Sequence, residues 1–173
     1  MKRQFLKLAL AVSAASVLAA CGGDDDTLAA PAPTKNIVEL AQATPSLSIL
    51  VEAVVAADLA STLSGAGPFT VFAPTDAAFA ALLAELGVTK AALLADKALL
   101  TKVLTYHVVS GKVLKAGIPF GTPITTVQGE TITIDTSAVI TDARARKSQI
   151  TATDILATNG VVHLIDKVIL PKP

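Results

Sequence analysis

Few side chains in this chain of 173 residues have the types and spacing that catalysis or metal binding requires. There is one cysteine, Cys21, and there are two histidines, His107 and His163. A metal site needs clustered ligands, whereas the nearest His–acid pair, His163 and Asp166, has an odd spacing that puts the two side chains on opposite faces of a strand. No Gly-x-Ser-x-Gly sequence presents a serine nucleophile. We therefore expect no catalytic residue, no metal, no cofactor and no enzymatic activity.

The two histidines are better explained by hydrogen bonding inside a core. His107 lies in the segment 105–109, which has strand character, and His163 alternates with Val161 and Ile165. A neutral imidazole carries one donor and one acceptor, so a folded chain can satisfy it internally. We interpret both histidines as structural residues.

Cys21 stands at the end of a sequence typical of export. Basic residues near the start precede an apolar run over residues 8–20, which is too short to span a bilayer. The run ends in Leu-Ala-Ala and then Cys21, which resembles the lipobox of bacterial lipoproteins, where the cysteine carries lipid and becomes the new N-terminus. We expect a signal peptide over residues 1–20 and a membrane anchor through lipid on Cys21. The alternative is an ordinary secretory signal in which the cysteine has no role.

The composition indicates one packed domain without a nucleic-acid partner. Removing Lys2, Arg3 and Lys7 with the signal leaves 11 of the 14 basic residues against 14 acidic ones, a net charge of −3. This balance argues against nucleic-acid binding, and the remaining length suits one domain with a sizeable core. With one cysteine no disulfide can form within the chain, so stability must come from packing.

The chain is organised as a tether followed by helices. Residues 21–34 are small, acidic and proline-rich, and they predict a flexible tether because they cannot bury a core. A short buried strand is expected over residues 69–73, and Gly87 is expected to end the helix that follows it. Helix N-caps are predicted at Asn36, Thr44, Thr75, Thr89 and Asp96.

The second half changes to strand periodicity. Turns are predicted at Gln128-Gly129 and Asn159-Gly160. Residues 161–165 are apolar on both faces, so that strand is expected to be central. Helices followed by strands predict an α+β domain with a mostly antiparallel sheet. The predicted strands cover residues 106–109, 112–114, 124–127, 131–135, 138–141, 149–157 and 161–170.

Three segments, in order, resemble the fasciclin-like domain family. They are residues 69–79 (Phe-Thr-Val-Phe-Ala-Pro-Thr-Asp-Ala-Ala-Phe), the pair Tyr106-His107, and residues 159–171 (Asn-Gly-Val-Val-His-Leu-Ile-Asp-Lys-Val-Ile-Leu-Pro). The resemblance covers residues 35–171. Together with the lipobox-like sequence, the chain resembles a bacterial lipoprotein member of this family. The resemblance implies a β-wedge of mostly antiparallel strands flanked by several helices. It also implies adhesion or protein–protein contact rather than catalysis, although a fold alone does not deliver a function.

The resemblance implies two candidate binding motifs. In animal members the Tyr-His pair has been tied to adhesion, and the matching residues here are Tyr106 and His107. An Asp-Ile adhesion motif is matched by Asp154 and Ile155. The alternative for both motifs is that they belong to the core.

A third candidate comes from charge. Arg144, Arg146 and Lys147 are the densest positive charge of the mature chain and lie in an expected loop. They suit contact with an acidic partner, such as an anionic envelope polymer, and the alternative is a solvated turn.

These features predict a lipid-anchored protein of the cell envelope with a single domain that binds a protein or an anionic polymer. Gly22 stands where an aspartate would resemble an inner-membrane retention signal. The outer membrane is therefore favoured where the cell has one, and otherwise the outer face of the plasma membrane. The alternative function is that of a carrier or sensor, which would bind a small apolar ligand in a cavity between helices and sheet.

Overall fold

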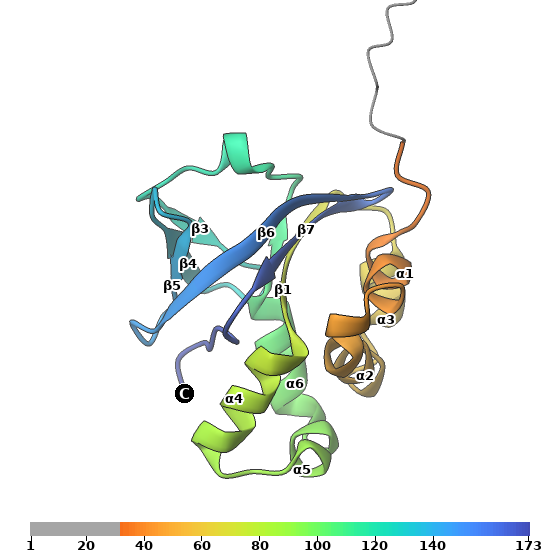
Figure 1. The fold of residues 1–173 in the computed structure, drawn as a ribbon, viewed down its shortest axis with the longest axis vertical. Helices are drawn as coiled ribbons and strands as arrows, with labels where there is room; N and C mark the ends of the chain where they lie inside the picture. The colour runs from red at the N-terminus through yellow and green to blue at the C-terminus, as the bar shows by residue number, and fades with distance from the viewer. Residues whose placement is uncertain (1–31) are drawn as a thin grey trace, which may run out of the picture. The chain divides into compact units, whose positions relative to one another are not determined.

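The computed structural model describes residues 32–173, in which residues 33–173 form one domain of helices and strands (Figure 1). Residues 1–31 lie outside the described part, and with them the expected signal peptide, Cys21 and most of the expected tether.

The helices occupy most of the first half of the domain, as predicted. Four of the predicted N-caps, Asn36, Thr75, Thr89 and Asp96, accept a hydrogen bond from the backbone N–H three residues later. Gly87 ends its helix in the left-handed conformation, with φ of 64°. The helices are α1 (Ile37–Gln42), α2 (Ser48–Ala56), α3 (Ala60–Ser64), α4 (Asp76–Leu86), α5 (Lys90–Ala95) and α6 (Lys97–Tyr106), with 3₁₀ turns η1 (Pro45–Leu47) and η2 (Lys115–Gly117).

The fifth predicted cap, Thr44, precedes Pro45 at the start of a helical turn, as predicted, but that turn is the 3₁₀ turn η1 and the Thr44 side chain accepts no capping hydrogen bond. The Thr44 hydroxyl donates back to the carbonyl of Leu40 at 2.8 Å, and the intervening turn η1 delays the start of α2. The carboxylate of Asp76 takes over instead, because it accepts hydrogen bonds from the Ile49 N–H at 2.8 Å and the Ser48 hydroxyl at 2.6 Å. One side chain at the start of α4 therefore also holds the start of α2.

The strands form a sheet in the order β2-β1-β7-β6-β5-β4-β3. Only the β1–β7 pair is parallel among the described strands, so the α+β prediction with a mostly antiparallel sheet is confirmed. β7 is paired on both sides, as its apolar sequence predicts. The strands are β1 (Phe69–Pro74), β2 (Val108–Ser110), β3 (Pro123–Thr125), β4 (Thr131–Ile134), β5 (Val139–Thr141), β6 (Lys147–Ala157) and β7 (Gly160–Ile165).

Three strand predictions differ from the structure. Residues 112–114 form part of an irregular connection, and Tyr106 is the last residue of α6. β7 ends at Ile165, although residues 168–170 are apolar and buried. The backbone N–H groups of Ile169 and Leu170 are bonded by side chains rather than by a neighbouring strand. Residues 168–170 therefore have the apolar sequence of a buried strand although they pair with no strand.

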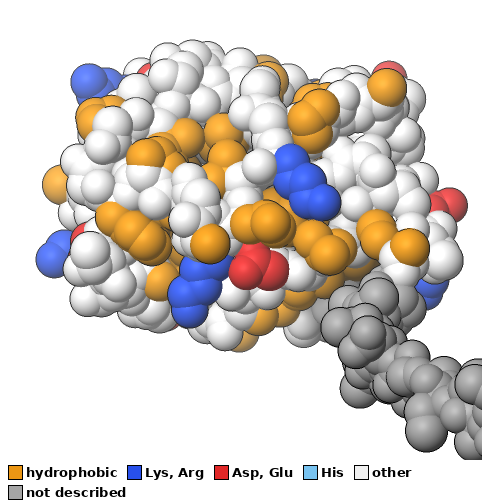
Figure 2. Space-filling model, turned by 90° about the horizontal axis from the view of Figure 1, so that it is seen from above, with side chains coloured by type: hydrophobic (Ala, Val, Ile, Leu, Met, Phe, Trp, Pro, Cys, Tyr) orange, Lys and Arg blue, Asp and Glu red, His pale blue; other side chains and the backbone are white. Residues whose placement is uncertain are grey.

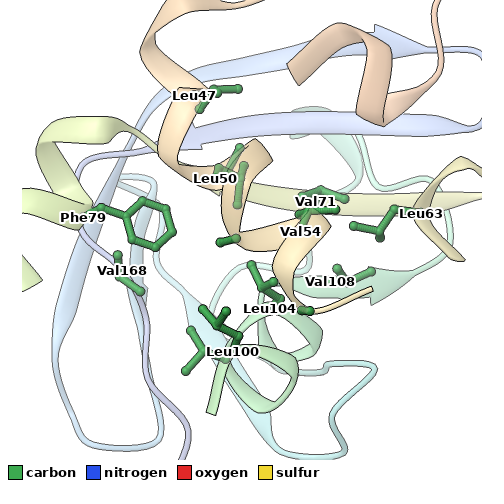
Figure 3. Close-up of a cluster of buried hydrophobic side chains, with 14 of the residues drawn as sticks. Leu47, Leu50, Val54, Leu63, Val71, Phe79, Leu100, Leu104, Val108 and Val168 are labelled. Carbon is green, nitrogen blue, oxygen red and sulfur yellow. The ribbon is translucent and has the colours of Figure 1, made fainter. Parts of the chain in front are cut away.

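The two faces of β1 and β7 contact different cores. Val71 and Val162 face the helices, in a cluster with side chains of α2, α4 and α6 (Figure 3). Phe72 and Ile165 alternate with them and pack against the isoleucines of β4 and β5. The long strand β6 pairs with β7 through its later residues and with β5 through its first residues, so it connects the two halves of the wedge (Figure 1).

Candidate functional site

The Tyr106-His107 pair lies inside the domain. Tyr106 ends α6 and His107 caps it, and their exposed fractions are 0% and 2%. Neither side chain is available to a partner in this structure. The pair therefore does not form the contact surface that the resemblance implies, and its geometry matches the alternative of core residues.

Both ring nitrogens of His107 are used internally. Nδ1 donates to the carbonyl of Val103 at 2.7 Å, and Nε2 accepts the backbone N–H of Ile169 at 3.2 Å. This arrangement requires the neutral imidazole, because Nε2 must offer a lone pair. Burial lowers the pKa of His107 to about 4. His107 therefore joins the end of α6 to the C-terminal segment as an uncharged group.

Tyr106 makes a second set of internal bonds. Its hydroxyl donates to the carbonyl of Thr131 at 3.1 Å and accepts the N–H of Ala143 at 2.8 Å. Burial raises the pKa of Tyr106 to about 12, so the hydroxyl keeps its proton at neutral pH. The side chain ties α6 to β4 and to the turn between β5 and β6.

Asp142 completes this internal network, in a role that the sequence pattern does not indicate. It is 5% exposed, and its carboxylate accepts backbone N–H groups of Arg144, Arg146 and Leu170, each at 2.9 Å. The bonds to residues two and four positions later are a local turn signal that the sequence offers. The bond to Leu170 joins segments 28 residues apart, and no local pattern predicts it.

Arg144, Arg146 and Lys147, the three basic residues predicted to form a contact, do not share one set of partners. Arg144 Nε donates to the carbonyl of Pro171 at 2.6 Å, and Arg146 pairs with Glu85 of α4 at 2.7 Å. Lys147 is exposed at the start of β6. Arg146 and Lys147 share a surface hollow of about 420 Å³ with Lys167, which we name the basic hollow; it is lined by Ala78, Ala81, Leu82, Glu85, Arg146, Lys147, Lys167 and Val168.

The Asp154-Ile155 motif has one exposed and one half-buried member. Asp154 lies at an irregularity of β6 with φ of 59°, a conformation that aspartate tolerates better than most residues. Its N–H donates to Nδ1 of His163 at 3.2 Å, and its carboxylate accepts the N–H of Lys115 at 2.7 Å. Ile155 packs against the helix-facing core. The motif therefore fixes the connection between β2 and β3 to the sheet.

His163 is buried in the same region. Its Nε2 donates to the carbonyl of Val113 at 2.9 Å, and its ring stacks on Phe72 with centroids 5.6 Å apart. Because Nδ1 accepts the N–H of Asp154, both ring nitrogens of His163 are hydrogen-bonded to the backbone, as they are at His107.

A separate apolar hollow of about 210 Å³ lies between α4, α5, α6 and the C-terminal residues. Leucines are half of its lining residues, and the basic residues among the lining are Lys102, Arg144 and Lys172. Such a wall suits an apolar molecule, and the cations suit an acidic group attached to it.

The described residues contain no group of three or more His, Cys, Asp or Glu side chains placed to hold a metal ion. Within the same part of the chain, every buried side-chain nitrogen and oxygen has a hydrogen-bond partner. No described helix has both the length and the apolar character needed to cross a membrane.

Comparisons with known proteins place this geometry in a family. A model of the fasciclin domain matches residues 45–171. Protein sll1483 of Synechocystis sp. is 45% identical over 139 residues, which cover 79% of this chain and 73% of that protein. The transforming growth factor-beta-induced protein ig-h3 of Sus scrofa is 34% identical over 140 residues, 80% of this chain but 20% of that longer protein.

The fold has a solved counterpart. The FAS1 domain pair from the insect cell adhesion molecule fasciclin I superposes with a TM-score of 0.67 at 17% identity. The match covers 80% of this chain and 51% of that chain. At 17% identity this match shows only that the folds are alike. The family relationship rests on the match to the fasciclin domain model and on the relatives at 30% identity or more. The chain is thus a member of the fasciclin domain family.

Proposed function

We propose that this protein is held at the cell envelope by lipid on Cys21 and that its single fasciclin domain mediates adhesion by binding a protein or an anionic polymer. The observation that carries the proposal is the combination of a fasciclin domain over residues 45–171 with the export-like sequence that ends at Cys21. Both histidines are bonded to backbone groups, which leaves neither imidazole free for acid–base chemistry. The solved relative is described as a cell adhesion molecule.

Anchoring is tested by metabolic labelling with a fatty-acid analogue. The wild-type protein takes up label and sediments with membranes, whereas the Cys21→Ser protein does neither. Fractionation of the envelope tests the outer-membrane location expected from Gly22. Equal labelling of the two proteins contradicts lipid attachment at Cys21.

The basic hollow is the candidate contact for an anionic polymer. Arg146, Lys147 and Lys167 line it, and Glu85 is the one acidic side chain among its lining residues. Arg146 is already paired with Glu85, so the two lysines carry the excess charge. Exposed charges are screened beyond about 10 Å at 0.1 M salt, and binding through them should weaken as salt increases.

A matched pair of variants isolates this contact. Lys147→Gln with Lys167→Gln should weaken binding to purified anionic envelope polymer and reduce its salt dependence. Lys35→Gln with Lys97→Gln removes the same charge from exposed positions outside the hollow. Equal loss in both double variants would assign the effect to net charge and contradict a contact at the hollow.

Binding of a small apolar ligand is a second candidate, because the wall of the hollow of about 210 Å³ is mostly apolar. Titration with a fluorescent apolar anion, 1-anilinonaphthalene-8-sulfonate, tests it. Leu99, which is 38% exposed and lines the hollow, is suitable for substitution by Gln. Saturable binding that this substitution removes would support a carrier or sensor, and unsaturable or unchanged binding would contradict it.

A further inference from the structure

The connection between β2 and β3 presents apolar and basic side chains outward. Leu114 and Phe120 are each 38% exposed, and Lys112 and Lys115 are exposed close to them in sequence. The connection lies at the top of Figure 1, where η2 projects. Seen from that side, the domain surface shows apolar side chains gathered around Lys or Arg groups, with an Asp or Glu side chain between them (Figure 2).

Leu156 of β6 belongs to the same side of the sheet. It is 37% exposed and pairs with Val161, which lies beside Thr70 in the parallel register. Paired residues share a face of a sheet. The Thr70 hydroxyl donates to the carbonyl of Gly111 at 2.6 Å and accepts the N–H of Val113 at 2.9 Å, so the connection crosses this face. We name Lys112, Leu114, Lys115, Phe120 and Leu156 the upper patch.

Hydrogen bonds hold the upper patch in place. Asp154 accepts the N–H of Lys115, and His163 donates to the carbonyl of Val113, so both sides of Leu114 are fixed to the sheet. The N–H of Gly121 donates to the carbonyl of Ile134 at 2.7 Å, next to Phe120. The exposed apolar side chains are therefore displayed on a supported backbone.

The chain enters the domain beside this patch. The N–H of Thr158 donates to the carbonyl of Lys35 at 2.9 Å, and the N–H of Ile37 donates to the side chain of Asn159 at 3.0 Å. Thr158 is two residues from Leu156. Eleven residues separate Cys21 from Pro33, and a fully extended chain of that length reaches about 40 Å. Lipid on Cys21 would therefore keep the patch within reach of the bilayer.

We propose that the upper patch rests on the bilayer that holds the lipid anchor, with Leu114 and Phe120 in the boundary between headgroups and acyl chains. Lys112 and Lys115 then lie against anionic phospholipid headgroups. Apolar burial and attraction to anionic lipid add together at such an interface. The anchor raises the local concentration, so a small patch suffices. This orientation rests on the lipid anchoring proposed above, and it turns the basic hollow, near α4 and the β5–β6 turn, away from the membrane (Figure 1).

The chain has no tryptophan, so one introduced indole reports on its own surroundings. The lipidated full-length protein carrying Phe120→Trp is reconstituted in vesicles of phosphatidylethanolamine and phosphatidylglycerol, with or without brominated acyl chains. Leu114→Trp is a second probe in the patch, should Phe120→Trp perturb folding. Val88→Trp is the matched control, since Val88 is 39% exposed between α4 and α5, at the other end of the domain (Figure 1).

We expect a blue-shifted emission and at least twofold quenching by brominated lipid for both patch probes, and neither change for Val88→Trp. Adding Lys112→Gln and Lys115→Gln should reduce the quenching in anionic vesicles. Proteins that float with vesicles but show no quenching of either patch probe overturn the orientation and leave the anchor intact. Proteins that do not float overturn both. Equal quenching of Val88→Trp also overturns the orientation. A blue shift that depends on protein concentration without lipid overturns it too, in favour of a second copy on the patch.

Discussion

Two regions of this domain each use one histidine and one aspartate to hold an irregular segment. In one region the aspartate is buried, and in the other it is exposed. In the C-terminal region, His107 and Asp142 bond the backbone of Ile169 and Leu170. In the upper region, His163 bonds Val113, and Asp154 bonds Lys115. Each pair combines an imidazole bonded to backbone groups with a carboxylate that accepts a backbone N–H.

The two regions differ in where they direct apolar side chains. Asp142 is 5% exposed, and the segment it holds buries Val168, Ile169 and Leu170. Asp154 is exposed, and the segment it holds leaves Leu114 on the surface. The same chemistry therefore stabilises the core in one place and displays a surface in the other. Damage to the first region should cost stability, and damage to the second should cost little stability and alter binding.

The largest expected effect is that of Asp142→Ala. It removes an acceptor from three backbone N–H groups, including the buried one of Leu170. Unpaired buried donors cost about 1–3 kcal/mol each, so we expect a loss of about 3–4 kcal/mol in the free energy of unfolding. Chemical denaturation measures it. Asp142→Asn keeps one acceptor oxygen and should lose less, and equal losses would show that the hydrogen bonds are not the cause.

The second-largest expected effect is a loss of stability at acidic pH that is caused by His107. Its pKa is lowered from 6.5 to about 4, so between these values the unfolded chain binds a proton that the folded chain does not. Its contribution is therefore complete above pH 6.5 and is lost as the pH falls toward 4, by about 3 kcal/mol in total.

The test compares wild type with His107→Leu by denaturation from pH 4 to 8. Because the carboxylates are common to both proteins, their contributions cancel in the difference, apart from the interaction of Asp142 with His107 itself. The stability difference should shrink as the pH falls below 6.5. A difference that stays constant over this range would mean that His107 is not held neutral by the fold.

Asp154→Ala should have a smaller effect, of about 1 kcal/mol. It removes the acceptor for Lys115 at a site that is exposed, and alanine tolerates the φ of 59° less well than aspartate. Hydrogen exchange should show faster exchange of the Lys115 amide. Asp154→Asn retains both the acceptor and the tolerance of this φ, so it should restore slow exchange. Fast exchange in both variants would place the restraint elsewhere.

The sequence predicted what depends on neighbouring residues. Asn36 and Thr75 were recognised as caps because the N–H groups they accept lie three residues away. Asp142 and Asp76 were not recognised in their roles, because Leu170 and Ile49 are far from them in the chain.

The candidate sites followed the same rule. Arg146 and Lys147 were identified from their adjacency, whereas Lys167 joins them only through the fold. The burial of Tyr106 and His107 could not be read from a dipeptide, because it depends on how β4 and the C-terminal segment pack over the end of α6. Groups of residues that are adjacent in the chain could thus be predicted, whereas groups that only the fold brings together, and the burial of their side chains, could not.

The smallest expected effect on stability is that of Lys112→Gln with Lys115→Gln. Asp154 holds Lys115 through its backbone N–H, so this substitution leaves the hydrogen bond in place. Both side chains are exposed, and exposed substitutions usually change the free energy of unfolding by less than about 0.5 kcal/mol. Denaturation should therefore give the wild-type midpoint, and the Lys115 amide should exchange as slowly as in wild type. A loss comparable to that of Asp154→Ala would mean that the lysine side chains support the fold, and the upper region would then resemble the C-terminal region rather than contrast with it.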